Sequence, residues 1–148
     1  MTTEVDSFER FDPFVHEHEC LHETLGDLRW FLEERRSPEK FASALAEFAD
    51  HVQAHFVHEE EAEGFFDNVI DQAPRLKTRA DALIEEHAVM SRELARLQRH
   101  AKEGVVSDEW WSQLNEEFES FWQLFCRHER AENDLVQEAF HDDLGSAD

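Results

Sequence analysis

The sequence predicts an all-α protein that folds as an up-down-up-down four-helix bundle. Apolar residues recur at alternating spacings of three and four residues over most of the 148-residue chain. This periodicity is typical of helices that bury one face, and we call each such row an apolar stripe. Short segments with turn or capping residues separate the stripes, so consecutive helices are expected to pack antiparallel. No segment shows the two-residue alternation of a half-buried strand.

The first two helices each begin with a capping residue followed by proline. Asp12 and Pro13 are expected at the N-cap and first helical position of a helix that runs to about residue 36. Ser37 repeats the same signal before Pro38. The apolar stripe of the second helix then continues without interruption, so we expect this helix to extend to residue 67 or 68.

The second half of the chain repeats this organisation. A turn at residues 71–74 leads into a third helix that carries its apolar stripe from Leu76 and ends at Gly104. Ser107 is expected to cap a fourth helix, which runs to about Phe140. The expected organisation is an N-terminal arm (1–11), the bundle (12–142) and a flexible tail (143–148).

Six polar residues interrupt the apolar stripes at positions that should face the core. They are His18, His55, Glu59, His87, His128 and Glu132. Four of them form two His–Glu pairs, His55 with Glu59 and His128 with Glu132. The members of each pair are four positions apart, which places both side chains on one face of a helix. Burying an ionised carboxylate without a partner costs several kcal/mol. We therefore expect a bound cation to compensate these charges.

The two halves of the chain also resemble each other. Glu17 and His18 correspond to Glu86 and His87 at an offset of 69 residues, and the His55 pair corresponds to the His128 pair at an offset of 73. These offsets indicate that a two-helix unit occurs twice, which predicts a pseudo-twofold repeat.

The number of ligands suits two metal ions rather than one. If Glu59 and Glu132 each bridge two ions, every ion receives two imidazole nitrogens and two carboxylate oxygens. An oxo or hydroxo bridge would add a fifth ligand and leave a sixth position open. Mixed nitrogen and oxygen ligands without thiolate favour iron or manganese over a closed structural zinc site.

With these residues, the chain resembles the hemerythrin-like (HHE cation-binding) family. The resemblance covers all four helices and rests on Glu17-His18, His55-Phe56 with Glu59-Glu60, Glu86-His87, and His128 with Glu132. It implies a non-haem di-iron centre inside the bundle. The four histidines would be terminal ligands and the two glutamates the bridges. Manganese or zinc could replace iron in recombinant protein.

Two positions differ from the oxygen-carrying members of that family. Leu83 stands where those proteins have a fifth histidine, and Glu132 follows its histidine by four residues where they have an aspartate after five. The ligand set is closer to di-iron proteins that repair damaged iron centres and to an iron- and oxygen-sensing domain. The resemblance implies binding of, or reaction with, O₂, NO or peroxide, in sensing, scavenging or stress protection. The alternatives are a non-enzymatic iron-binding, iron-sensing or storage module and an oxygen carrier.

Apolar residues of the stripes should form a dry wall around the open coordination position. They are Phe14, Leu21, Phe48, Val52, Leu83, Met90, Phe121 and Phe125. Such a wall admits a small diatomic gas or peroxide and excludes larger substrates. The chain has no tyrosine, and no acid stands out on the stripes as a proton donor. Whether the centre turns over is left open.

Charge and cysteine content limit the other partners. A formal net charge of −22 makes nucleic acid and anionic membranes poor partners. Cys20 and Cys126 lie beside the stripes without CxxC spacing, as packing residues of a reduced protein. With no apolar run of membrane length and no secretion signal, we expect a cytoplasmic monomer or homodimer.

The remaining histidines are expected outside the ligand set. His22, His51 and His58 lie within one residue of stripe positions and are interpreted as flanking residues that could support the ligands. His16, His100 and His141 are expected to be exposed.

Overall fold

A computed structural model describes residues 11–146, with side chains through Phe140. All regular structure in this part of the chain is helical, which confirms the all-α class. The elements are α2 (Asp12–Glu34), α3 (Pro38–Glu60), α4 (Phe65–Gln72), the 3₁₀ turn η1 (Pro74–Leu76), α5 (Lys77–Lys102) and α6 (Asp108–Ser146). None of the helices described is long and apolar enough to cross a membrane.

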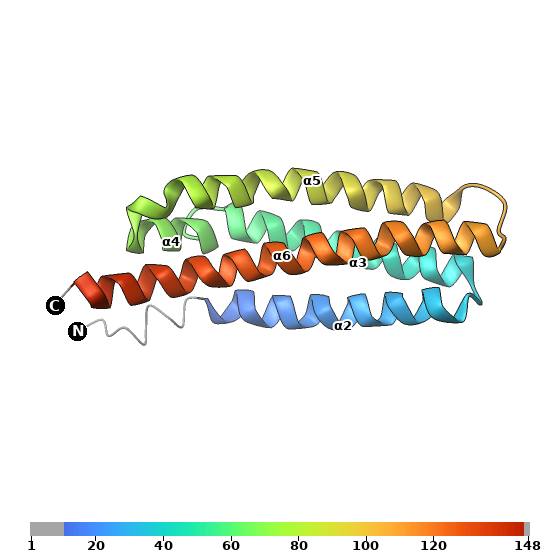
Figure 1. Cartoon of the computed structure of the whole chain (residues 1–148), viewed down its shortest axis with the longest axis horizontal. Coiled ribbons are helices and arrows are strands. Elements are labelled where there is room, and N and C mark those ends of the chain that lie inside the picture. Colours follow the sequence, from blue (N-terminus) through green and yellow to red (C-terminus); the bar gives the residue numbers. More distant parts are fainter. Residues whose placement is uncertain (1–10, 147–148) are drawn as a thin grey trace.

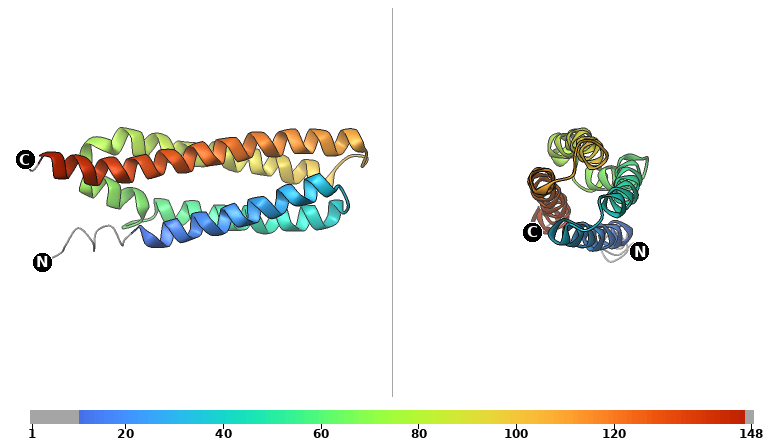
Figure 2. Two further views of the ribbon diagram at one scale, coloured as in Figure 1. Left: turned by 60° about the horizontal axis from the view of Figure 1, so that its bottom comes forward. Right: turned by 90° about the vertical axis from the view of Figure 1, so that its right-hand side faces the viewer.

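The four long helices lie side by side along the long axis of the molecule (Figure 1). Viewed end-on, they surround a common core in the order α2, α3, α5, α6 (Figure 2). Helix α2 packs against α3 and α6, and α5 packs against the same two helices. The turn between α2 and α3 and the loop between α5 and α6 lie at one end, and α4 lies at the other (Figure 1).

The helix starts follow the capping residues closely. Ser37 caps α3 as predicted, because its side-chain oxygen accepts a hydrogen bond from the amide of Lys40 at 3.2 Å. Ser107 accepts one from the amide of Trp110 at 3.1 Å. The prediction for α2 was wrong by one residue: Phe11 is the N-cap and Asp12 is the first helical residue. Helix α2 ends at Glu34, where Arg35 adopts a left-handed conformation with φ 50°.

The second helix is interrupted, contrary to the prediction that it continues to residue 67 or 68. Helix α3 ends at Glu60, and a turn through Gly64 starts the separate helix α4. A Cβ on Gly64 would lie 2.5 Å from the carbonyl oxygen of His58, so the turn depends on glycine there. Ala62, expected on the apolar stripe, is exposed. The turn instead brings Phe65 and Phe66 into the core.

Helix α6 is longer than predicted. It continues past Phe140 to Ser146, because no proline or capping signal interrupts it. The side chain of His141 lies outside the described part of the chain, so its predicted exposure is not addressed. The same holds for residues 1–10 and 147–148, which include most of the expected arm and the end of the expected tail.

The apolar core consists of two clusters with buried polar residues between them. The larger cluster fills the bundle toward the end where α5 and α6 are joined and includes Leu28, Phe41 and Phe118. The smaller cluster lies around α4 and includes Phe66, Val69 and Leu135. The core is thus divided by a polar layer, which contains all six residues singled out in the apolar stripes.

Candidate metal centre

Six buried polar side chains from all four long helices meet in this layer. His18 comes from α2, and His87 comes from α5. Helices α3 and α6 each contribute a His–Glu pair, His55 with Glu59 and His128 with Glu132. Both carboxylates are almost fully enclosed, with exposed fractions of 0% for Glu59 and 1% for Glu132. The structure therefore brings together the six residues that the sequence singled out.

Their ligand atoms form two overlapping groups of four. One group is His18, His55, Glu59 and Glu132, and the other is Glu59, His87, His128 and Glu132. Within each group the atoms lie within 4.8 Å of one another. Both glutamates belong to both groups, whereas each histidine belongs to one. This is the arrangement expected for two neighbouring cations with shared carboxylates.

Glu59 has the orientation of a bridging carboxylate. Its Oε2 lies 3.3 Å from Nε2 of His55, and its Oε1 lies 3.2 Å from Nε2 of His87. Two ligands held about 2.1 Å from one ion are about 3.0 Å apart at right angles and about 3.4 Å apart in a tetrahedron. The two distances fall in this range, on opposite oxygens of one carboxylate.

The second glutamate, Glu132, reaches the same layer from α6. Oε1 of Glu132 lies 3.0 Å from Nε2 of His128 and 3.9 Å from Nε2 of His18. The Nε2 atoms of His87 and His128 are 3.1 Å apart, which is also the separation of two ligands on one ion. Every histidine of the set thus directs Nε2 to the centre.

Buried polar atoms without a hydrogen-bond partner show whether these residues suit a metal ion. Both oxygens of Glu59 and of Glu132, and Nε2 of His18 and His55, are buried without a hydrogen-bond partner. Leaving such groups unpaired costs about 1–3 kcal/mol each, and more for a charge. Cations between them would satisfy all six atoms at once, so the donor set fits metal ions.

The two carboxyl groups differ in their affinity for protons. Burial, together with the neighbouring Glu59 carboxylate, raises the pKa of Glu132 well above its usual range. Burial alone would raise the pKa of Glu59 too, but the neighbouring Glu132 carboxyl group and the imidazoles of His18, His55 and His87 hold it well below that range. Without a cation, the protonated form is therefore favoured more strongly at Glu132 than at Glu59.

Three further glutamates hold the outer nitrogens of the histidines. Nδ1 of His55 lies 2.5 Å from Oε2 of Glu17, and Nδ1 of His87 lies 2.9 Å from Oε2 of Glu60. Nδ1 of His128 lies 3.0 Å from Oε1 of Glu86. Each glutamate belongs to the long helix that precedes the long helix of its histidine. These contacts fix the rings with Nε2 inward, as carboxylates do for metal-bound histidines.

Phe56 and Phe66 enclose the His87 side of the centre. The ring of Phe56 lies parallel to that of His87, with centroids 3.9 Å apart. Phe66 approaches the same imidazole at 5.7 Å. Neither phenylalanine was among the wall residues predicted from sequence. Phe56 stands directly after a ligand, and Phe66 reaches the site only because of the turn at Gly64.

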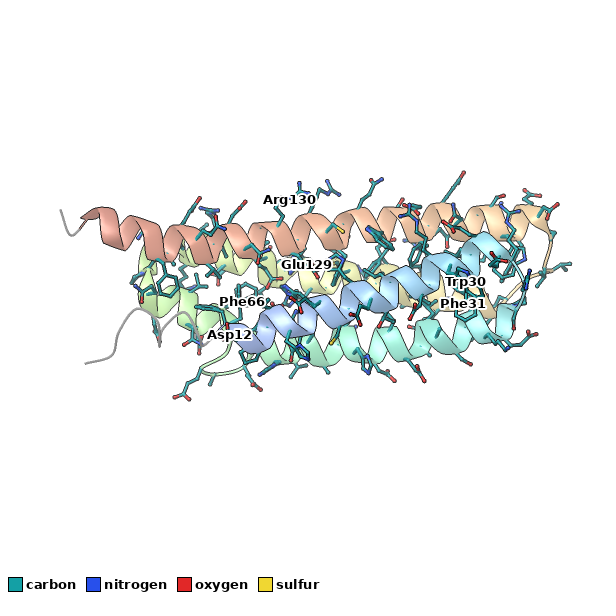
Figure 3. All side chains as sticks on the ribbon, turned by 90° about the horizontal axis from the view of Figure 1, so that it is seen from below. Asp12, Trp30, Phe31, Phe66, Glu129 and Arg130 are labelled. Atoms are coloured by element: carbon teal, nitrogen blue, oxygen red, sulfur yellow. The ribbon has the colours of Figure 1, made fainter. Side chains whose placement is uncertain are left out.

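The His18 side has a buried acid that the sequence analysis missed. Glu129 points from α6 toward α2, while the adjacent Arg130 points away from the bundle (Figure 3). Oε2 of Glu129 contacts Nε2 of His22, and Oε1 is buried without a partner. Burial raises the pKa of Glu129, although the nearby His18 and His22 oppose the shift. Glu129 lies beside the apolar stripe of α6 rather than on it, so a search for acids on the stripes could not find it.

The predicted wall residues are all buried, but in different places. Phe14 and Leu83 belong to the smaller core cluster near α4. The other six are in the larger cluster: Leu21, Phe48, Val52, Met90, Phe121 and Phe125. The polar layer thus has apolar side chains on both of its faces.

The other histidines and cysteines differ in part from expectation. His22 and His58 each contact a glutamate of the site, Glu129 and Glu17 respectively. His100 is not exposed as predicted, because it packs against Trp110 and contacts Glu117 at 2.9 Å. Cys20 is exposed rather than packed, and Cys126 is partly exposed.

Comparison with known families agrees with this geometry. The model of the hemerythrin HHE cation-binding domain matches residues 9–140. The match spans most of the chain, which therefore belongs to the hemerythrin HHE cation-binding family, as the resemblance in the sequence implied. No curated protein and no solved structure shows a significant match.

Proposed function

We propose that the centre holds two non-haem iron ions and binds or reacts with O₂, NO or peroxide. One ion would be held by His18 and His55 and the other by His87 and His128, with Glu59 and Glu132 shared. The observation that supports this most is the pair of overlapping four-residue groups with both carboxylates in common. Iron, when bound, supplies one-electron redox chemistry and affinity for small diatomic ligands.

The surroundings favour small ligands over large substrates. The apolar clusters on both faces of the layer, including Phe48, Phe125 and Leu83, limit the space around the centre. The only deeply buried acid beside the ligand set in residues 11–140 is Glu129. A site of this kind suits sensing, scavenging or protection against oxidative or nitrosative stress.

We also propose that the bundle is an up-down-up-down arrangement of a duplicated two-helix unit. Two equivalent contacts support the repeat: Glu17 holds His55, and Glu86 holds His128. Both contacts join a residue that precedes a histidine ligand to a histidine one helix further on. The order of the helices around the core is consistent with this arrangement (Figure 2).

A non-enzymatic iron-binding module is the second candidate. It is favoured by the unsatisfied carboxylate oxygens of Glu59 and Glu132, since metal would then serve to stabilise the bundle. A large fall in melting temperature on chelation is expected in this case. An unchanged melting curve would argue against it.

The test is metal analysis of the purified protein with an optical spectrum before and after adding each ligand. We expect two iron ions per chain and an absorption change with at least one of O₂, NO and peroxide. His128→Ala should reduce iron well below two per chain. His100→Ala is the matched control, because its Nδ1 also contacts a glutamate but its ring lies against Trp110. Iron-loaded protein that responds to none of the three ligands would leave only the second candidate.

A further inference from the structure

A groove on the surface between α2 and α3 lies directly outside the centre. It has a volume of about 410 Å³, and Glu17 and His55 form part of its wall. The other polar residues that line it are His16, Cys20, His51 and His58. The groove therefore gathers three imidazoles and a thiol that the proposed centre does not use.

His16 and Cys20 are already spaced as two ligands of one metal ion. They stand four residues apart on α2, and Sγ of Cys20 lies 3.7 Å from Nε2 of His16. A tetrahedral ion with bonds of about 2.3 Å to sulfur and about 2.1 Å to nitrogen separates those atoms by about 3.6 Å. Binding would need almost no movement of this pair.

His51 lines the same groove from α3 and is the candidate for a third ligand. Its side chain would have to rotate toward the pair, because His16, Cys20 and His51 do not form a group of ligand atoms within 4.8 Å of one another. Its side chain is exposed on α3, one helical turn before His55. His58 is less free, because Oε1 of Glu17 holds its Nδ1 at 2.8 Å. Three protein ligands leave a fourth position open to water, which is typical of exchangeable sites rather than closed structural ones.

The groove also leads toward the centre. Glu17 contacts His58 in the groove through one oxygen and His55 through the other. Behind His55 lies Glu59, whose Oε2 is 3.3 Å from Nε2 of His55. Phe56 covers the ring of His87, which belongs to the other group of ligand atoms. The groove is thus linked to Glu59 through Glu17 and His55.

We propose that His16, Cys20 and His51 form an outer site for a divalent transition metal ion, from which ions pass to the buried centre. Thiolate with imidazole selects borderline ions such as Fe²⁺, Co²⁺ and Zn²⁺ over Mg²⁺ or Ca²⁺. The net charge of −22 raises the local concentration of cations near the groove. The passage of ions from the outer site to the buried centre, which we call the loading role, rests on the proposed function. The outer site itself does not.

The outer site is tested by titrating metal-free protein with Co²⁺ and recording thiolate-to-cobalt charge transfer in the near ultraviolet. We expect this band in the wild type and in Cys126→Ser, the matched control for the second cysteine. It should vanish in Cys20→Ser and fall severalfold in His16→Ala and in His51→Ala. No band in the wild type, or a band that survives Cys20→Ser, would overturn the outer site.

The loading role is tested by the rate at which Co²⁺ fills the centre at limiting concentration. Cys20→Ser should slow filling of the buried centre about tenfold and leave the final occupancy of that centre unchanged. An unchanged rate would overturn this role. Glu132→Ala separates the two proposals, because it should disable the inner centre and retain the thiolate band. Loss of the band in that variant would show that the two sites are not independent, contrary to the proposal.

Discussion

The ring of Phe56 lies flat on the imidazole of His87, with 3.9 Å between centroids and 7° between planes. Phe56 is the residue directly after the candidate ligand His55, so one stretch of α3 reaches both groups of candidate ligands. The stack restrains the orientation of the His87 ring.

Removing this stack should loosen one half of the centre. Phe56→Ala is expected to destabilise the protein by about 3–5 kcal/mol, because a buried phenyl ring is lost. About half of the bound metal should then be released faster to a chelator. Phe118→Ala is the control: this ring is fully buried on α6 and packs on Trp122. If the control releases metal equally fast, the effect comes from general loosening of the core.

The glutamates behind the histidines should tune metal affinity. Replacing Glu17 or Glu86 with glutamine keeps the shape but removes the charge that holds Nδ1 of His55 or His128. Loss of such a partner typically costs 10- to 100-fold in metal affinity. Isothermal titration with Co²⁺ measures the change. Glu117→Gln is the matched control, since Glu117 makes the same contact with His100.

The two bridging candidates should behave differently in metal-free protein. The pKa of Glu59 is lowered and that of Glu132 is raised. Glu59→Gln should therefore lower the unfolding free energy at neutral pH more than Glu132→Gln does. Both variants should nevertheless lose metal. Equal destabilisation by the two substitutions in chelator-treated protein would contradict this assignment of the proton.

The pH dependence follows from the directions of the two shifts. The pKa of Glu132 is raised above the ordinary 4.5, so the folded state keeps a proton that the unfolded state loses. Stability of the metal-free wild type should therefore fall relative to Glu132→Gln above pH 4.5, by up to about 1.4 kcal/mol per pH unit. The pKa of Glu59 is lowered from 4.5, so its contribution is present above pH 4.5 and is lost as pH falls toward its folded value. Urea unfolding measures both trends when it covers the range from about pH 2.5, for Glu59, to about pH 8, for Glu132.

Gly64 should be essential for the turn that directs α4 toward the site. In Gly64→Ala the added carbon would lie 2.5 Å from the carbonyl of His58 and 2.8 Å from that of Glu61. Because these are backbone atoms, the backbone itself must move to make room. We therefore expect a loss of roughly 1–3 kcal/mol in unfolding free energy. Gly26→Ala is the control, as a Cβ there meets nothing within 4 Å. Gly26 lies within a helix, so alanine should be neutral or stabilising there.

Helical periodicity was sufficient to predict the six residues that meet in the polar layer. A histidine or glutamate on an apolar stripe must be buried wherever the stripe is buried. Its position along the helix determines which other polar residues lie at the same height in the bundle. The interruption after Glu60 could not be read in this way. Glu61, Ala62 and Glu63 are all compatible with a helix, whereas the turn depends on Gly64 and on the packing of Phe65 and Phe66 in the smaller core cluster.

Residues one position away from the stripes were the hardest to predict. Glu129 follows His128 directly and becomes buried only because α2 approaches α6 at that level, where His22 meets it. Cys20 lies beside a stripe as well, yet it is exposed because α2 and α3 diverge into a groove there. Periodicity describes one helix at a time, whereas these environments depend on the distance between two.

The offset of 73 residues that pairs His55 with His128 also pairs Phe56 with Glu129. An aromatic ring on one side of the centre is thus matched by an acid on the other. Two cations bound here would experience different surroundings despite equivalent ligands. A first equivalent of metal should therefore favour one position, and the protein could order two unlike ions as a defined heteronuclear pair.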